Sequence, residues 1–412
     1  MRFMPMTAFG SIALLACNGG SAGGNTQTQP AGNAQSQSVE GAPFTLTKVA
    51  QFDQPFAIAF LPDGSALVTE KTGKLKHWHA DGHTQDIAGV PATAQVTQGG
   101  LLDVALAPDF AKSRTIYLSY SEPRPQGSSL ALARATLSGT QLQNFTVIFR
   151  AGADGRGGQF GSVIAFAPDG KSLFLSSGER QRFTPAQDPN QALGKILHLT
   201  LDGKPAPGNP GAGKTGSSTI TVIDPPRNSG AAKTATGRTE TISGPNLAPA
   251  QTWTSGHRNP YGLVFDAAGH LWETEMGPKG GDEVNLIVKG RNYGWPNASN
   301  GDNYDGTPIP DHAAGDGYEA PKVFWNPSIS PGGLLYYTGN GFPQWKGSLL
   351  IGALSGQALI RVALNGTNAS KADQWNLGMR IRDVAQSPDG TLWLLEDGRG
   401  GTGGSLMRVS PK

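Results

Sequence analysis

Two short stretches carry cations and amides whose spacing suits the binding of an anion. In "GHRNPYG", Arg258 and Asn259 stand just before a predicted strand, where a planar guanidinium can bind a carboxylate or hold a neighbouring loop through its carbonyls. In "RIRD", Arg380 and Arg382 alternate along a strand, so both side chains project from one face. Two adjacent cations repel each other unless a negative charge lies beside them. This pair therefore predicts either an anionic ligand or an internal carboxylate partner.

A third stretch, "EMGPKGGDEVNL", mixes carboxylates with turn-forming residues and is followed by "GRNYGWP". Its acidic residues are Glu275, Asp282 and Glu283. Hard cations such as Ca²⁺ take carboxylates and backbone carbonyls from loops of this kind. The spacing does not match an EF-hand, and ordinary solvated turn charge is the alternative interpretation.

Two glutamines lie beside glycines just ahead of predicted strands. They are Gln98 in "QGGLLD" and Gln159 in "GGQFGSVIAFAPDG". Gln159 stands either in linker or where a reaction would need a proton acceptor. A glutamine amide has no useful basicity near neutral pH, so it cannot serve as a general base.

A loose repeat positions these residues. Each unit is an apolar strand, a turn resembling Pro-Asp-Gly, and a second strand rich in β-branched and aromatic residues. Six units begin at Pro55, Gly100, Gly161, Asn259, Gly332 and Arg380. This pattern predicts an all-β, six-bladed β-propeller over residues 44–412, with a strand from Phe44 completing the last blade. Two stacked β-sandwich domains are the alternative.

The composition limits the classes of partner. The chain has 412 residues with a net charge of +2, and Gly and Pro together make up about a fifth of it. No block of like charge occurs, so a nucleic-acid partner is not expected. The single cysteine, Cys17, excludes an internal disulfide and a zinc cluster built from thiolates.

The N-terminal segment has the pattern of an export signal. Arg2 precedes a short apolar run that ends in "LLAC", so residues 1–17 are interpreted as a lipoprotein signal peptide with a lipid on Cys17 as the membrane attachment. A plain secretory signal is the alternative. Residues 18–43 have almost no apolar mass and are predicted to be a flexible linker. Asn18 after the cysteine favours an outer-membrane lipoprotein of the cell envelope, facing the periplasm or the surface.

Six motifs, in this order, carry a family resemblance: "QGGLLDVALAPDF", "AQDPNQALGKILHL", "GHRNPYGLVFD", "EMGPKGGDEVNLI", "RNYGWP" and "RIRDV". From Phe44 to the C-terminus the chain resembles the soluble aldose sugar dehydrogenases that use pyrroloquinoline quinone (PQQ), the glucose/sorbosone dehydrogenase family. The resemblance implies a six-bladed propeller that binds PQQ and Ca²⁺ at the top of its channel. It also implies oxidation of the anomeric C–H of a sugar to give a lactone.

The resemblance assigns roles to individual residues. It implies cofactor contacts at Gln98, Arg258 and Asn259, arginines for the PQQ carboxylates at Arg380 and Arg382, carbonyls for the cofactor calcium at Gly277 and Pro278, and ligands of a further, structural calcium at Glu283 and Tyr293. These roles agree with the chemistry of the residue types, because PQQ is a tricarboxylate that paired arginines can bind. Calcium would polarise the quinone carbonyl as a Lewis acid.

The chain departs from the family pattern at four positions. Gln159 stands where the family has its histidine base, and Val163 stands where it has an arginine. Ser355 replaces a frequent lysine, and Tyr261 replaces a common glutamine. Glu179, in "SSGERQ", matches the carboxylate that partners the histidine in relatives, and would itself act as a base if burial raised its pKa.

The sequence therefore predicts PQQ- and calcium-dependent oxidation of aldose sugars to lactones, with electron transfer to an acceptor and with reduced or altered activity because of Gln159. A positioned base contributes roughly 10²- to 10⁴-fold to a rate, so its loss slows the reaction without removing the cofactor chemistry. The alternatives are a non-catalytic propeller lipoprotein that binds a sugar or another ligand, and a calcium-dependent lactonase.

Overall fold

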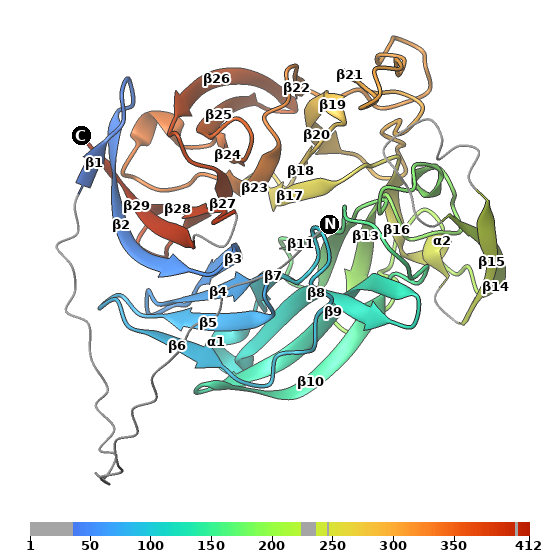
Figure 1. Cartoon of the computed structure of the whole chain (residues 1–412), viewed down its shortest axis with the longest axis horizontal. Helices are drawn as coiled ribbons and strands as arrows, with labels where there is room; N and C mark the ends of the chain where they lie inside the picture. Colours follow the sequence, from blue (N-terminus) through green and yellow to red (C-terminus); the bar gives the residue numbers. More distant parts are fainter. Residues whose placement is uncertain (1–35, 224–235, 245–246, 400–402) are drawn as a thin grey trace, which may run out of the picture. The chain divides into compact units, whose positions relative to one another are not determined.

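The computed structural model describes residues 36–223, 236–244, 247–399 and 403–412. Within these residues, six antiparallel sheets follow one another around a central channel (Figure 1). The predicted six-bladed propeller is therefore confirmed in place of two sandwiches. The proposed signal peptide and Cys17 lie outside the described residues. None of the helices in the described part of the chain is long and apolar enough to cross a membrane.

The strands of each blade are given in order from the channel outward. Blade 1 contains β3 (Pro55–Phe60), β4 (Ala66–Glu70), β5 (Lys74–Trp78) and β6 (Thr84–Ile87); blade 2 contains β7 (Leu101–Leu106), β8 (Thr115–Arg124), β9 (Gly127–Ser138) and β10 (Gln141–Arg150). Blade 3 contains β11 (Gly161–Phe166), β12 (Ser172–Ser177), β13 (Lys195–Thr200) and β16 (Thr252–Ser255); blade 4 contains β17 (Pro260–Phe265), β18 (Leu271–Glu275), β20 (Asp282–Ile287) and β22 (Val323–Trp325). Blade 5 contains β23 (Pro331–Tyr336), β24 (Leu349–Ala353), β25 (Ala358–Asn365) and β26 (Asn368–Asn376); blade 6 contains β27 (Ile381–Gln386), β28 (Leu392–Glu396), β29 (Gly404–Pro411), β2 (Phe44–Phe52) and β1 (Ser36–Ser38).

The remaining elements are short. Two small ribbons lie outside the blade sheets: β14 (Gly216–Ile223) with β15 (Gly237–Gly244), and β19 (Lys279–Gly280) with β21 (Gly301–Asp302). The helical turns are α1 (Phe110–Ser113), α2 (Ala248–Gln251), η1 (Thr184–Ala186) and η3 (Pro343–Trp345). Each is only one turn long, so strands carry nearly all the regular structure.

The Asp-Gly turns form as the repeat predicts. In blades 1, 3 and 6, the aspartate side chain accepts the N–H two residues later at 3.0 Å: Asp63 from Ser65, Asp169 from Lys171, and Asp389 from Thr391. The glycine that follows has positive φ in each case, between 67° and 87°. Glycine adopts this conformation at no steric cost, which explains why the same pair recurs between the first two strands.

The ring closes through the N-terminal strand β2, as the sequence predicts. β2 pairs antiparallel with β29 along its length, from Phe44 opposite Pro411 to Phe52 opposite Gly404. The Phe44 ring is fully buried, and its centroid lies 5.5 Å from that of Trp375. Trp345 lies 5.9 Å away on the neighbouring blade. One strand from the start of the propeller therefore completes its last sheet.

The ordered domain begins before the boundary predicted at Phe44. β1 pairs with β2, although it lies in the stretch expected to be a flexible linker. Val39 and Ala42 are buried, and Lys412 donates hydrogen bonds to the carbonyls of Val39 and Pro43. The physical reason is that β2 would otherwise leave an unpaired outer edge, which another strand satisfies.

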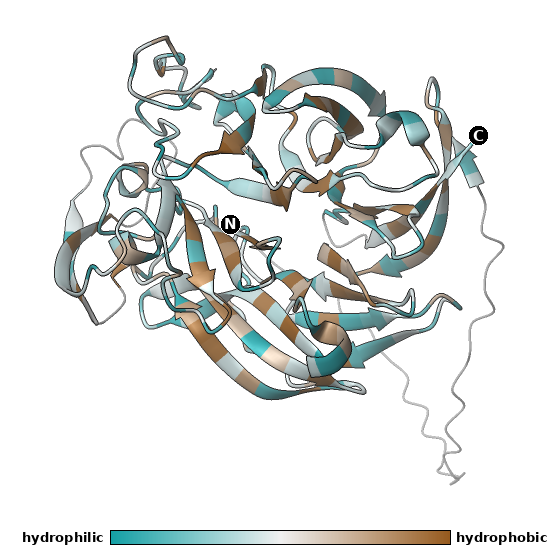
Figure 2. Ribbon diagram, turned by 180° about the vertical axis from the view of Figure 1, so that it is seen from behind, coloured by the Kyte–Doolittle hydropathy of each residue, from teal (hydrophilic) through white to brown (hydrophobic). Residues whose placement is uncertain are grey.

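Apolar residues are concentrated on the blade strands, whereas the connecting loops are mainly hydrophilic (Figure 2). The second strand of each blade is largely buried. In β4, β18 and β24, for example, every residue is buried. The core therefore lies between neighbouring blades and around the channel rather than in one central cluster.

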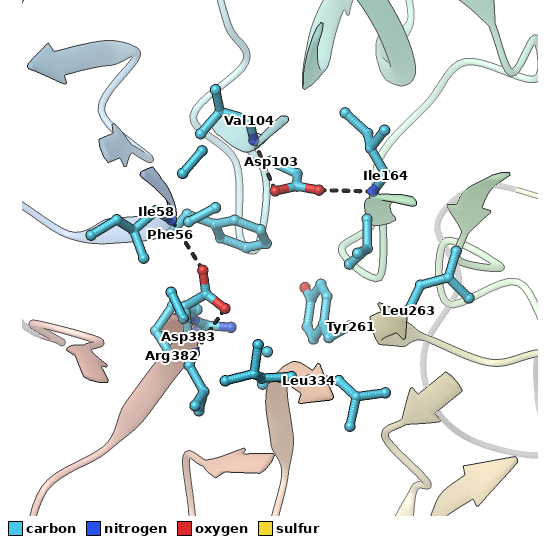
Figure 3. Close-up of a pocket in the computed structure, with 18 of the residues that line it drawn as sticks. Phe56, Ile58, Asp103, Val104, Ile164, Tyr261, Leu263, Leu334, Arg382 and Asp383 are labelled. Atoms are coloured by element: carbon cyan, nitrogen blue, oxygen red, sulfur yellow. Dashed lines mark hydrogen bonds between the residues drawn. The ribbon is translucent and has the colours of Figure 1, made fainter. Parts of the chain in front are cut away.

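The innermost strands line a channel cavity of about 300 Å³ that contains two aspartates (Figure 3). Asp103 accepts the N–H of Ile164 on the next blade at 2.7 Å, and Asp383 accepts that of Ile58 at 3.0 Å. Each carboxylate thus links the innermost strands of two neighbouring blades by a hydrogen bond. The low hydration of the channel raises the pKa of both aspartates to about 7, and the charge of Asp383 adds to the shift of Asp103.

Replacing the aromatic anchor of the closing strand should destabilise the ring. We expect Phe44→Ala to lower the free energy of unfolding by about 3–5 kcal/mol, the usual effect of deleting a buried phenylalanine. Phe324→Ala is the control because that ring is 44% exposed, and it should change stability by less than about 0.5 kcal/mol. Urea unfolding of both variants tests this, and equal effects would contradict the role of β2 in closure.

The channel aspartates should make stability fall with rising pH. Their folded-state pKa lies above the unfolded value, so protonation stabilises the folded state and this contribution is lost between about pH 4 and pH 7. We expect the unfolding free energy of the wild type, minus that of Asp103→Asn, to decrease across this window by up to ~1.4 kcal/mol per pH unit. Urea unfolding at four pH values measures the difference. A constant difference would refute it.

Candidate active site at the channel mouth

The predicted site residues lie in loops at one end of the channel, which we call the mouth. Innermost and second strands are antiparallel, so the first begins where the second ends, at the mouth. Gln98, Gln159, Arg258 and Arg380 come just before innermost strands, and Glu179 comes just after a second strand. All six innermost strands shift register within their first few residues, which bends the backbone at the mouth.

Gln159 is buried at the mouth and joined to two other predicted residues. It is 2% exposed, with φ of 53°, and its N–H donates to Gln98 Oε1 at 2.7 Å. The Tyr261 hydroxyl donates to the same oxygen at 3.1 Å. The Gln159 side chain accepts the backbone N–H of Gln181 at 3.2 Å. The structure therefore brings Gln98, Gln159 and Tyr261 together, although Gln98 and Tyr261 are 163 positions apart.

Glu179 is fully buried in the same region. Its Oε2 accepts the backbone N–H groups of Arg182 and Phe183, and among the described residues Oε1 has no hydrogen-bond partner. Burial raises the pKa of Glu179 to about 7, although the charge of Arg258 and the two hydrogen bonds oppose the shift. Near neutral pH this carboxyl can therefore either hold or release a proton.

Two arginines that the sequence analysis did not single out fix the loops around Gln159. Arg180 lies over the Phe160 ring at 3.9 Å, and it donates to Ser128 and to the carbonyls of Gly155, Gly157 and Gly158. Arg182 donates to carbonyls of residues 153, 154 and 156. Arg180 itself has φ of 63°, a conformation that non-glycine residues adopt only when the surroundings impose it. The segment before Gln159 is therefore held by buried guanidinium groups.

Arg258 holds the neighbouring glycine-rich loop. Its Nη1 donates to the carbonyls of Met276 at 2.9 Å and Gly277 at 2.7 Å. Its guanidinium lies 5.2 Å from the Trp295 ring and 5.8 Å from that of Tyr304. The sequence left two roles open for Arg258, namely binding a carboxylate or holding a neighbouring loop through its carbonyls. The structure shows the second role. It also places Arg258 against the loop predicted to bind the cofactor calcium.

Asn259 connects blades 3 and 4. Its Oδ1 accepts the N–H of Gly161 at 3.3 Å, and its own N–H donates to Glu275 at 3.2 Å. Glu275 also accepts the N–H of Arg258, so one buried carboxylate fixes the backbone of both predicted cofactor contacts. The two side chains are thereby positioned by blade 4.

Arg380 and Arg382 share one internal partner, Asp397. Arg380 Nε donates to one Asp397 oxygen at 2.9 Å, and Arg382 donates to the other at 2.6 Å and 2.9 Å. Burial opposes ionisation of Asp397, but the charge of Arg382 and the hydrogen bonds outweigh it and lower its pKa. Lys71 directly follows β4 at the mouth, and burial and the charge of Arg382 lower its pKa. The guanidinium groups of Arg380 and Arg382 therefore share a single carboxylate at the mouth.

The predicted cation-binding loop is closely packed. Gly277 donates its N–H to Asp282 at 2.9 Å, and an added Cβ at Gly277 would lie 2.2 Å from the Gly280 carbonyl oxygen. Only glycine fits there. Pro278 is buried beside it. The other oxygen of Asp282 accepts the N–H groups of residues 329 and 330, so Asp282 holds the next loop.

Three buried glutamates lie behind this loop. Glu273, Glu275 and Glu283 extend from β18 and β20, and burial followed by the charge of Glu275 raises the pKa of Glu273 and Glu283 well above the usual range. His257 lies 3.2 Å from Glu275, and ligand atoms of His257, Glu273 and Glu275 lie within 4.8 Å of one another. These three carboxylates would repel one another if all were charged, and a bound cation would stabilise them.

Predicted cofactor and cation residues border one small cavity. Arg258, Gly277, Glu283 and Tyr293 all line it. The Tyr293 hydroxyl is engaged, because it donates to the Leu286 carbonyl and accepts the N–H of Val288 at 2.9 Å. The oxygen donors around this cavity are carboxylates and carbonyls, which is the chemistry that Ca²⁺ prefers, so the residues present fit such an ion.

Two of the departures from the family pattern have clear local roles. Ser355 donates to the Ser330 hydroxyl at 2.8 Å and so binds the loop beside it. Val163 lines the channel cavity, and its N–H donates to Ser176 at 2.9 Å. Neither side chain carries the positive charge of the lysine or arginine that the family pattern has at these positions.

Several functional residues were missed by sequence reasoning, chiefly Asp397 and Lys71. The sequence contained a signal for Asp397. A carboxylate ends the second strand of three blades, namely Glu70, Glu275 and Glu396. Asp397 directly follows Glu396, so aligning the repeats would have placed Asp397 at the mouth.

Comparison with known proteins agrees with this geometry. The family model for Glucose / Sorbosone dehydrogenase matches residues 52–224 and 234–408. Aldose sugar dehydrogenase YliI of Escherichia coli (strain K12) is 36% identical over 375 residues, covering 88% of this chain and 91% of the relative. Quinoprotein glucose dehydrogenase B of Acinetobacter calcoaceticus is 25% identical over 440 residues, covering 85% of each.

Solved structures extend the match to the fold. The apo-form of the soluble aldose sugar dehydrogenase from Escherichia coli has a TM-score of 0.77 at 35% identity, covering 90% of this chain and 100% of that one. The PQQ-bound aldose sugar dehydrogenase from Streptomyces coelicolor has a TM-score of 0.67 at 28% identity, covering 92% and 99%. Because the family model spans nearly the whole propeller, the chain belongs to the glucose/sorbosone dehydrogenase family.

Proposed function

We propose that the protein is a PQQ- and calcium-dependent aldose sugar dehydrogenase that oxidises sugars to lactones and passes the electrons to an acceptor. The observation that carries this proposal is the charge at the mouth: the guanidinium groups of Arg380 and Arg382 share one carboxylate, that of Asp397. PQQ carries three carboxylates, so its binding would neutralise the excess of positive charge. The named relatives support the same substrate and cofactor.

The cofactor and the calcium would be held by different parts of the mouth. Arg380 and Arg382 would bind carboxylates, while Gln98 and Asn259 offer amides. The carbonyls of Gly277 and Pro278 would bind the cofactor Ca²⁺, and Glu283 and Tyr293 would bind the further, structural Ca²⁺. When bound, PQQ supplies the two-electron acceptor that protein side chains lack.

Sugar oxidation also needs a group that takes a proton. Loss of hydride from C1 leaves a hydroxyl proton to be removed, and Gln159 cannot accept it. Glu179 is the carboxyl in this region whose pKa lies near 7. However, Glu179 is fully buried, so a sugar hydroxyl could reach it only through a rearrangement or a bridging water. We therefore expect turnover well below that of a site with a histidine base.

A non-catalytic, ligand-binding propeller is the second candidate. The observation in its favour is that both Gln159 and Ser355 are committed to neighbouring loops by hydrogen bonds. This candidate predicts PQQ or sugar binding without any sugar-dependent reduction of a dye. Measuring binding and dye reduction on the same sample separates the two functions.

We also propose that the protein is attached to the cell envelope through a lipid on Cys17, at the outer membrane. Support comes from the sequence alone, since the only cysteine falls at the end of the apolar run. Mass spectrometry of the protein isolated from membranes, with Cys17→Ser as the soluble control, would decide this attachment.

Calcium removal should destabilise the protein. A ligand that binds only the folded state adds about 2.7 kcal/mol at a hundredfold excess over its Kd, which corresponds to roughly 5 °C in Tm. We expect a chelator to lower Tm by this amount and Ca²⁺ to restore it. Glu283→Ala should have the lower Tm and a weaker response to chelator, whereas Glu40→Ala, at an exposed position, should respond like the wild type. A wild type indifferent to chelator would refute the calcium assignment.

Restoring a base at position 159 should raise activity. Histidine tolerates the positive φ of this position better than most residues, and its unperturbed pKa of about 6.5 suits neutral pH. With PQQ and Ca²⁺ present, we expect Gln159→His to increase sugar-dependent dye reduction by roughly one to three decades. Gln159→Asn is the matched control, since it keeps an amide and should remain slow.

Two outcomes would change this interpretation. High activity of the wild type that Glu179→Gln abolishes would make Glu179 the working base. Failure of both the wild type and Gln159→His to bind PQQ, measured by absorbance titration, would refute the dehydrogenase proposal and leave the ligand-binding propeller.

A further inference from the structure

A histidine cluster lies on the face of the propeller opposite the mouth. Three of the seven histidines fall within seven residues, at His77, His79 and His83. β4 ends at the mouth and pairs antiparallel with β5, so β5 runs away from the mouth and the turn after Trp78 lies at the far end. We call residues 77–83 the histidine turn. It is separate from every residue of the mouth.

The backbone of the turn brings the three imidazoles together. His77 and His79 are two residues apart along an extended segment, so their side chains share one face. Their ring centroids lie 4.0 Å apart. The His79 N–H donates to the His83 carbonyl at 2.8 Å, and the rings of these two residues lie 5.8 Å apart. Asp81 accepts the N–H of His83 at 2.9 Å, which fixes the turn.

A second interaction orients His77 from behind. Ser65 donates its hydroxyl proton to Asp63 at 2.6 Å, so toward His77 Nε2, at 2.9 Å, it can only accept. Nε2 of His77 therefore carries the proton, and Nδ1 keeps its lone pair. A hydroxyl and a carboxylate behind a histidine are the arrangement that orients metal-binding imidazoles.

The other two imidazoles also have a nitrogen that no backbone group uses. His83 Nε2 lies 2.9 Å from the amide nitrogen of Gln85, which can only donate, so this histidine nitrogen presents a lone pair. Among the described residues, His79 Nε2 has no hydrogen-bond partner. Residues 80–83 are exposed, so the His83 side chain can turn toward His77 and the half-buried His79 without moving the sheet.

From this arrangement we propose that the histidine turn binds a divalent transition-metal ion of the Zn²⁺, Cu²⁺ or Ni²⁺ class through His77, His79 and His83. Neutral imidazole is a preferred ligand of these ions, whereas Ca²⁺ and Mg²⁺ prefer oxygen. Three protein ligands leave at least one coordination position for water or another ligand. This site does not depend on the proposed sugar oxidation, because it lies at the other end of the channel.

The test is Zn²⁺ titration of the full chain, without an added histidine tag, by competition with a chromogenic chelator. We expect His79→Ala and His77→Ala each to lower Zn²⁺ affinity at least tenfold. His270→Ala is the matched control, because His270 lies in the turn between β17 and β18 at the same end of blade 4 but pairs with Asp266 at 2.9 Å. It should bind Zn²⁺ like the wild type.

Ser65→Ala provides an independent arm. If the serine orients His77, its loss should weaken Zn²⁺ binding by about tenfold or more, the usual effect of removing such a partner. Tm measured without metal should be the same for all variants, which excludes misfolding. The proposal is overturned if the wild type binds no Zn²⁺, or if His77→Ala and His79→Ala bind it as tightly as His270→Ala does.

Discussion

Closure of the ring by β2 is the constraint on which the rest of the structure depends. A propeller blade buries its faces only against its neighbours, so an open ring would expose two sheets and spread the mouth. The pairing of β2 with β29 and the burial of Phe44 against Trp345 and Trp375 join the last blade to the first part of the chain. The mouth then collects loops from all six blades at fixed positions. Every contact between distant residues at the site follows from this closure.

Charged groups at the mouth are satisfied mainly by backbone. Arg180 and Arg258 donate to carbonyls, while Glu179 and Glu275 accept N–H groups. Each therefore fixes the course of a loop before any ligand arrives, which is the preorganisation that a binding site requires. The exception is the cationic group around Asp397, where positive charge exceeds negative. A site that is rigid and positive is ready for an anion without further ordering.

The repeat made the fold and the location of the site predictable. An Asp-Gly turn and two apolar strands are local features, and antiparallel pairing alone places their ends at the mouth. Asp397 as the partner of Arg380 and Arg382 could not be foreseen, because the residue types are equally consistent with an external anion. Nor could β1, whose sequence "SQS" has no apolar residue and pairs only because an edge is available beside it. Interactions decided by tertiary neighbours leave little trace in a single sequence.

Gln159 shows that the loop at the mouth fixes its backbone independently of the side chain. The residue is buried, and its positive φ and the hydrogen bond from its N–H to Gln98 are backbone features that the loop imposes. The amide then turns to Gln181 and leaves one oxygen of Glu179 without a partner. A buried, unpartnered carboxyl whose pKa is about 7 costs little when it is protonated. A glutamine at this position is therefore compatible with the fold, because the buried carboxyl of Glu179 can become neutral.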